Sequence, residues 1–107
     1  MGEQEFRSEC ERVLTVIEDA LDEAPFDVDT ERSDAVLRIE FDSGSQIIVS
    51  GNTPLREIWI AAKSGGFHYR RDGDRWVDTR SGEELFAGLS RAVSAQAATP
   101  IIVADTR

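Results

Sequence analysis

Short runs of alternating apolar and polar residues, separated by turn signals, fill the middle of this chain and limit its fold more than any other feature. Leu37, Ile39 and Phe41 alternate with charged residues, which is typical of a strand with one buried face. Similar runs lie at residues 26–29, 46–49, 58–61, 67–70 and 75–78. The connections are mostly short, and Asp72-Gly73 is a dipeptide that closes tight hairpins. Because short turns join antiparallel neighbours, the runs predict about six antiparallel strands.

An amphipathic helix is predicted on each side of the strand region. Over residues 3–23 apolar residues recur at three- and four-residue steps, and Ala24-Pro25 ends the pattern. A capping box of Ser81 and Glu84 is predicted to open the second helix. The apolar faces are Phe6, Cys10, Val13, Leu14, Ile17 and Leu21 in the first helix, and Leu85, Phe86, Leu89, Ala92 and Val93 in the second.

Each helix has one apolar face, so both are expected to cover the same side of the sheet, while its other side faces water. The predicted fold class is therefore α+β, a two-layer sandwich with two helices packed on one face of a roughly six-stranded antiparallel sheet. We find no internal repeat, low-complexity stretch or domain boundary, and residues 1–107 are interpreted as a single domain.

The negative charge is confined to the first third of the chain. The formal net charge is −9, and Met1 to Glu31 accounts for all of it, with eleven acidic and two basic residues. Arg32 to Arg107 holds ten residues of each sign. Such a field repels nucleic acid and anionic membranes, and it attracts cations and basic protein surfaces. Neither nucleic acid nor a membrane is expected as a partner.

Several functional classes lack the residues that they need. With Cys10 as the single cysteine, the chain cannot form an internal disulfide or supply a Cys-ligated cluster or zinc site by itself. There is no Ser-His-Asp set or phosphate loop. No apolar run approaches the roughly 20 residues needed to span a bilayer, and the N-terminus lacks the pattern of a signal peptide. We therefore expect a protein of the reducing cytoplasm.

The first candidate site is an acidic ridge on the first helix. Helical geometry places Glu11, Glu18 and Asp22 on one stripe opposite the apolar face, with Asp19 and Glu23 beside it. Like charges at i,i+4 repel by about 0.2–0.5 kcal/mol per pair, so the ridge is expected to destabilise the helix unless a cation binds. Carboxylates suit iron, manganese and calcium. The alternative is a solvated helix face. The candidate metal ligands are Glu11, Glu18, Asp19, Asp22, Glu23, Asp27, Asp29 and Glu31.

The second candidate site is the open side of the sheet. Ile58 and Ile60 are predicted to face the helices, so Trp59 faces water, and His68 is expected on the same side. Exposed tryptophan is a common anchor in protein interfaces. The alternative is that Trp59 only packs on cross-strand neighbours such as His68. Trp76 is predicted to lie in the core.

Several segments resemble the frataxin family in its bacterial form, called CyaY. They are residues 37–49, Pro54-Leu55-Arg56-Glu57-Ile58-Trp59-Ile60-Ala61, Gly65-Gly66-Phe67-His68-Tyr69, Trp76 and Arg80-Ser81-Gly82-Glu83, preceded by the acidic helix. The resemblance covers about nine-tenths of the chain and implies the helix–sheet–helix sandwich. Glu57 departs from the family, which often has Gln two positions before the tryptophan, and Ser50 and Asn52 stand where the family often has Asn and Gln.

The resemblance implies an iron-binding regulator of iron–sulfur cluster assembly that docks on the cysteine desulfurase and the scaffold protein. Iron, ferrous or ferric, is expected to bind weakly, other divalent cations to substitute, and the chain to be a monomer without metal. The implied partner-binding residues are Asn52, Glu57, Trp59, His68, Glu18, Asp19, Asp22 and Glu23. Two alternatives remain open: a ferroxidase that detoxifies iron, and an acidic interaction module that needs no metal. One acidic helix and one His offer little for an enclosed di-iron site.

Overall fold

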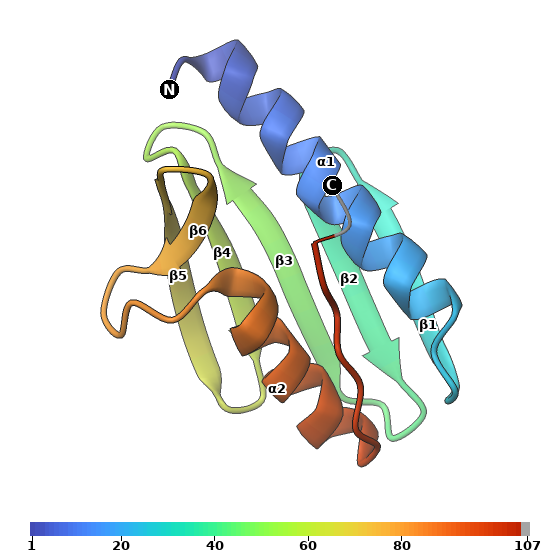
Figure 1. The fold of residues 1–107 in the computed structure, drawn as a ribbon. Helices are drawn as coiled ribbons and strands as arrows, with labels where there is room; N and C mark the ends of the chain where they lie inside the picture. The colour runs from blue at the N-terminus through green and yellow to red at the C-terminus, as the bar shows by residue number, and fades with distance from the viewer. Residues whose placement is uncertain (106–107) are drawn as a thin grey trace.

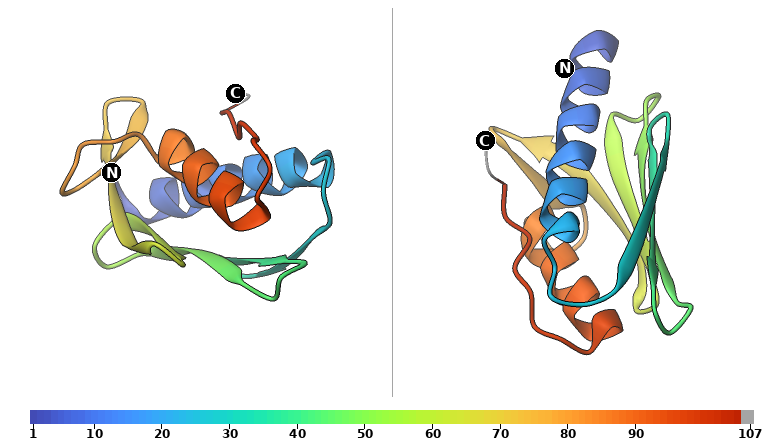
Figure 2. Two further views of the ribbon diagram at one scale, coloured as in Figure 1. Left: turned by 90° about the horizontal axis from the view of Figure 1, so that it is seen from below. Right: turned by 90° about the vertical axis from the view of Figure 1, so that its right-hand side faces the viewer.

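The computed structural model describes residues 1–105 and places two helices on one face of a six-stranded antiparallel sheet (Figures 1 and 2). The strands follow one another in the sheet in chain order, without a crossover. This confirms the predicted α+β sandwich. In chain order the elements are α1 (Glu3–Asp22), β1 (Val28–Ser33), β2 (Val36–Phe41), β3 (Gln46–Asn52), β4 (Glu57–Ala62), β5 (Gly65–Asp72), β6 (Arg75–Asp78) and α2 (Leu85–Ala97).

The two helices and one side of the sheet enclose the core. Both predicted apolar faces are buried, and the inward side chains of β2 to β6 meet them. Trp76 is buried and lies edge to face with Phe6 of α1, as predicted for a core tryptophan. Cys10 is also buried, and burial raises the pKa of its thiol. No element within residues 1–105 covers the opposite side of the sheet (Figure 2).

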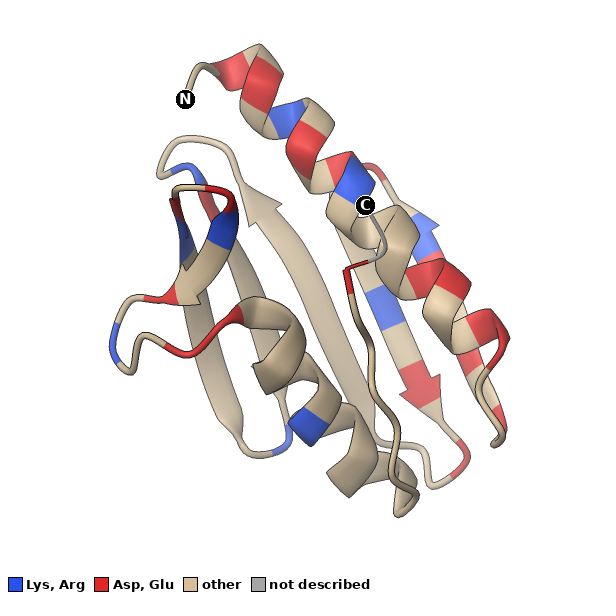
Figure 3. Ribbon diagram, in the orientation of Figure 1, with Lys and Arg blue, Asp and Glu red and all other residues tan. Residues whose placement is uncertain are grey.

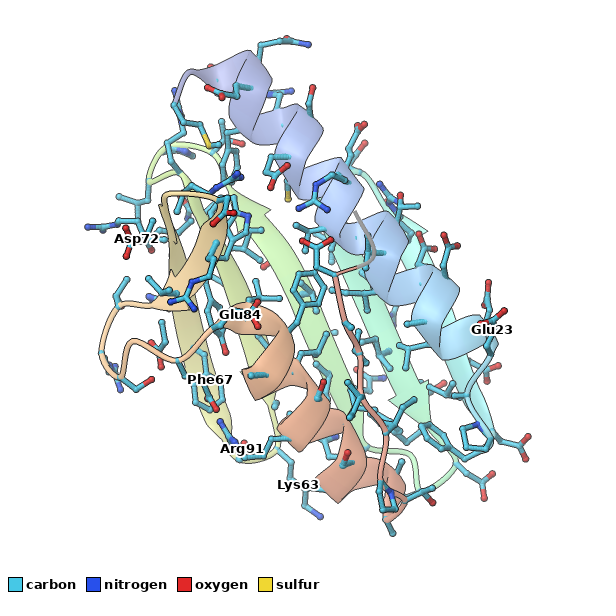
Figure 4. All side chains as sticks on the ribbon, in the orientation of Figure 1. Glu23, Lys63, Phe67, Asp72, Glu84 and Arg91 are labelled. Carbon is cyan, nitrogen blue, oxygen red and sulfur yellow. The ribbon has the colours of Figure 1, made fainter. Side chains whose placement is uncertain are left out.

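Two predicted boundaries are wrong. The first strand begins at Val28 rather than at residue 26, and it extends to Ser33 because its pairing with β2 continues to the Ser33–Val36 pair. The second helix does not open at Ser81. The Ser81 hydroxyl donates to the Asp78 carboxylate, and Gly82 adopts a left-handed φ of +77°. Glu84 is the N-cap instead, and its carboxylate accepts from the backbone N–H groups of Phe86 and Ala87 (Figure 4).

The segment after α2 returns along that helix and reaches α1 (Figure 1). The hydroxyl of Ser94 accepts from the Ile101 amide at 3.0 Å, and the hydroxyl of Ser90 accepts from the Val103 amide at 2.8 Å. Val103 is buried in the core, and Asp105 forms an ion pair with Arg12 of α1 at 2.8 Å. The segment therefore connects the two helices on the side away from the sheet.

A second polar contact joins α1 to the β5–β6 hairpin. The Glu9 carboxylate is only 8% exposed and accepts from Arg12 at 2.9 Å, from the Trp76 indole at 3.3 Å, and from Arg71. The hydrogen bond from Arg12 is the main reason that the pKa of Glu9 falls to about 2, and burial opposes this effect.

No helix within residues 1–105 is long and apolar enough to cross a membrane.

Candidate functional site

Four side chains from neighbouring strands form a connected group on the open side of the sheet. Trp59 of β4 and His68 of β5 are directly opposite in the register, and their rings stack with centroids 4.3 Å apart and an interplanar angle of 11°. The Trp59 indole N–H donates to Oε1 of Glu57 at 2.9 Å. Arg70 donates to the other carboxylate oxygen, Oε2, at 2.6 Å. We call Glu57, Trp59, His68 and Arg70 the aromatic cluster.

Glu57 is buried although it lies on the open side of the sheet. It is 4% exposed, whereas the side chain of Arg70 is 63% exposed. The hydrogen bond from Trp59 is the main cause that lowers the pKa of Glu57, with Arg70 and His68 acting in the same direction and burial opposing them. His68 Nδ1 lies 3.9 Å from Glu57 Oε1. The sequence placed Trp59 and His68 on one face and named Glu57 through the family resemblance. It did not identify Arg70, which is opposite Glu57 in the β4–β5 register.

Asn52 lies beside the aromatic cluster at the end of β3. It is paired with Glu57 in the β3–β4 register. Its side-chain oxygen accepts from the Leu55 amide at 3.0 Å, which closes the loop between the two strands. Arg56 in this loop has a left-handed φ of +54°. The structure thus gives Asn52 a role in shaping the loop and leaves Leu55 exposed next to it.

The acidic ridge of α1 is not uniform. Asp19, Asp22 and Glu23 line one shallow depression of about 400 Å³, together with Val16 and Ala20. Glu23 lies at the C-terminal end of α1 (Figure 4).

Glu18, by contrast, forms an ion pair with Arg32 of β1 at 2.8 Å, and the same guanidinium donates to Thr15. The expectation that the ridge is only self-repelling is therefore wrong at Glu18. Glu11 is exposed on the same helix, where its backbone carbonyl accepts from Arg32.

A second group of carboxylates lies where β1 begins and β2 ends (Figure 3). Asp29 is directly opposite Glu40 in the antiparallel register. Asp27, Asp29, Glu40 and Asp42 line a depression of about 280 Å³. Glu31, two residues further along β1, forms an ion pair with Arg38 instead. Sequence reasoning named Asp27, Asp29 and Glu31 and missed Glu40 and Asp42, which only the register brings beside them.

These carboxylates do not form an enclosed ligand set. Within residues 1–105, no three His, Cys, Asp or Glu side chains converge closely enough to hold a metal ion together. The oxygen donors suit hard cations, but exposed and separated carboxylates coordinate them weakly and with little selectivity. His68 lies in the aromatic cluster, on the open face, and not with Asp19, Asp22 and Glu23 in their depression on α1.

Comparison with known proteins places the arrangement in one family. Residues 1–99 match the family model described as a frataxin-like domain. The chain belongs to the frataxin-like family. The resemblance found in the sequence is thereby confirmed, and the two-layer sandwich with an open sheet face is the fold of a solved family member.

The relatives and the solved structure agree with this assignment. The chain is 48% identical over 101 residues to the iron-sulfur cluster assembly protein CyaY of Cupriavidus pinatubonensis, covering 91% of each chain. It is 50% identical over 99 residues to the protein of the same name from Ralstonia nicotianae, covering 92% of this chain and 88% of that one. The frataxin of Psychromonas ingrahamii superposes with a TM-score of 0.90 at 29% identity, covering 97% of this chain and 99% of that one.

Proposed function

We propose that this protein regulates iron–sulfur cluster assembly in the cytoplasm, binds iron weakly, and docks on the cysteine desulfurase and the scaffold protein. The observation that carries the proposal is the combination of family membership with two separate surfaces, the acidic α1–β1 region and the aromatic cluster. Its relatives are named as assembly proteins rather than as enzymes. We assign no catalytic residue, and we expect a monomer in the absence of metal.

Iron is treated as cargo that exposed carboxylates hold loosely. Asp19, Asp22 and Glu23 share one depression, and Asp27 and Asp29 share another with residues of β2. Oxygen ligands of this kind accept ferrous or ferric iron, manganese or calcium. Glu18 and Glu31 are engaged by arginines, so a cation has to compete with Arg32 or Arg38 for them. We therefore rank them below Asp19, Asp22 and Glu23.

Two-dimensional amide NMR during an iron titration tests the metal surface. Paramagnetic iron is expected to broaden the amide signals of residues 18–29 first, with the largest effect around Asp22 and Glu23. Broadening that starts on α2 instead would contradict the assignment. Measuring iron oxidation in air, with and without the protein, separates this proposal from a ferroxidase.

The acidic region is proposed to meet a basic surface of the desulfurase. Asp19 and Glu23 are exposed and have no ion-pair partner among residues 1–105, so they are available to a cationic surface. Association driven by such charges is fast at low salt and slows steeply as salt is added. The aromatic cluster is proposed to meet the scaffold, where a desolvated aromatic anchor depends little on salt.

Binding kinetics with each partner test this division. Asp19→Lys combined with Glu23→Lys is expected to slow association with the desulfurase about tenfold or more at low salt. The matched control, Asp72→Lys with Asp74→Lys, makes the same charge change at the exposed β5–β6 turn. Trp59→Ala is expected to speed dissociation from the scaffold and to leave desulfurase binding unchanged. Equal losses from the α1 variant and its control would show that only net charge matters.

A further inference from the structure

The burial of Glu57 on the open side of the sheet calls for a physical reason. A carboxylate is rarely buried unless it is paired, because an ionised group loses its hydration there. Other charged residues on this side, such as Glu31 and Arg38, remain exposed. Glu57 is paired here, since it contacts the side chains of Trp59, His68 and Arg70. Its two oxygens are used differently, with Oε1 holding the indole and Oε2 holding the guanidinium.

The hydrogen bond to Oε1 of Glu57 fixes the orientation of the Trp59 side chain. Trp59 is half-buried on this side of the sheet. A side chain that samples several conformations loses affinity because it has to be ordered on binding. Here the indole is held at its N–H by Glu57 and on one face by the His68 ring. Away from Glu57 and His68, its neighbouring positions are Ser50 on β3 and Ala61 on β4, which are small and uncharged. A partner therefore meets a fixed aromatic pair that has small uncharged neighbours on one side and the exposed Arg70 guanidinium on the other.

We propose that Glu57 is a positioning residue of the docking face, and that its carboxylate fixes the stacked Trp59–His68 pair before the partner arrives. The partner is the scaffold protein, and for that identity the inference rests on the proposed function. The positioning itself is a property of the free protein. Glu57 acts through Trp59, so its contribution to binding disappears when the indole is removed.

The free protein gives the first test, through the two indole N–H signals in its NMR spectrum. Trp76, whose indole N–H donates to Glu9, is the internal reference. Glu57→Ala is expected to move the Trp59 indole signal and to accelerate its hydrogen exchange about tenfold, because a charge-assisted hydrogen bond is lost. Glu57→Gln keeps an acceptor oxygen and is expected to change the exchange by less than about threefold. Unchanged exchange in Glu57→Ala, with the Trp76 signal intact, would overturn the proposal.

Affinity for the scaffold protein gives the second test, in the form of a double-mutant cycle. Glu57→Ala is expected to weaken binding about tenfold when Trp59 is present and by less than about twofold when Trp59 is replaced by Ala. The control is Glu83→Ala, which removes a carboxylate paired with Arg91 at the α2 side of the molecule and is expected to leave affinity unchanged.

The outcomes distinguish a failure of the positioning role from a failure of the proposed function. If Glu57→Ala weakens binding equally with and without Trp59, Glu57 contacts the partner directly, and the positioning role is overturned. A loss of affinity in Glu57→Gln as large as that in Glu57→Ala would also overturn it. If the unmodified protein does not bind the scaffold, the proposed function is wrong for this face, and the indole exchange still decides whether Glu57 positions Trp59.

Discussion

Glu9 shows how a single carboxylate can couple a helix to a hairpin. Its side chain is buried between α1 and β6, and Arg12, Arg71 and the Trp76 indole donate to it. The guanidinium of Arg71 also lies 5.7 Å from the centre of the Trp76 ring. Glu9 lies on the border of the apolar face of α1, where periodicity alone assigns a glutamate to solvent. Its burial depends on donors from residues about 60 positions away, which no local pattern reveals.

The lowered pKa of Glu9 predicts acid sensitivity. The folded-state pKa of about 2 lies below the ordinary value of 4.5, so the ionised group stabilises the fold above about pH 4.5, and this contribution is lost as the pH falls toward 2. The contribution is on the order of 3 kcal/mol. Urea unfolding of Glu9→Gln should therefore show lower stability than the unmodified protein at pH 7 and a smaller difference near pH 3. The exposed Glu3→Gln is the control, and a difference independent of pH would contradict the assignment.

Glu18 and Asp22 lie on one stripe of α1, yet opposite effects on stability are expected when their charges are removed. Glu18→Gln loses the partly buried pair with Arg32 and should destabilise the fold by up to about 1 kcal/mol. Asp22→Asn loses only repulsion from neighbouring carboxylates and should be neutral or stabilising by about 0.2–0.5 kcal/mol. Chemical denaturation at low salt, with Arg32→Ala as a further comparison, measures both. Stabilisation by both substitutions would mean that the Arg32 pair contributes nothing.

At the scale of the elements, periodicity predicted the helices and strands that bury one face. It missed the contacts that depend on the register between strands. The alternation in β2 and the spacing in α1 have a local cause, because each element buries one side. The start of α2 was wrong because Asp78 competes for the Ser81 hydroxyl, a contact outside the capping motif. The Glu57–Arg70 pair and the depression that Glu40 shares with Asp29 require cross-strand pairing, so their geometry could not be predicted.

The packing of α1 on β3 depends on the absence of a side chain at Gly51. A Cβ atom built at this position would lie 2.6 Å from the Cys10 sulfur, well inside contact distance. Gly51→Ala should therefore cost about 1–3 kcal/mol through overpacking. Cys10→Ala removes the clashing sulfur. Gly51→Ala should therefore cost less stability in a Cys10→Ala background than in the unmodified protein. Thermal unfolding of the four proteins in this cycle measures the coupling, and strictly additive effects would mean that the cost of Gly51→Ala does not come from the Cys10 sulfur.

At the scale of the whole molecule, the charge and the aromatic cluster occupy different regions. The carboxylates gather on α1 and along β1 and β2, while β4 to β6 carry mixed signs (Figure 3). Several arginines are paired with carboxylates across elements, including Arg32 with Glu18 and Arg70 with Glu57. The remaining negative charge includes two groups of carboxylates, one formed by Asp19, Asp22 and Glu23 and the other by Asp27, Asp29, Glu40 and Asp42. The surface that attracts cations is therefore also a surface that opposes folding through repulsion.

This conflict predicts how salt and cations change stability. Screening weakens the repulsion within the α1–β1 region more than it weakens exposed ion pairs, which contribute little, so sodium chloride should raise the melting temperature. Calcium chloride at matched ionic strength should raise it further if the carboxylates bind the cation, since a ligand of the folded state stabilises it. The variant Asp19→Asn with Asp22→Asn and Glu23→Gln should melt higher than the unmodified protein at low salt and lose most of the additional calcium effect. Calorimetry of both proteins in the two salts separates the effect of screening from the effect of calcium binding. A calcium effect that persists in the variant would place the cation elsewhere, with the carboxylates around Asp29 and Glu40 as the next surface to alter.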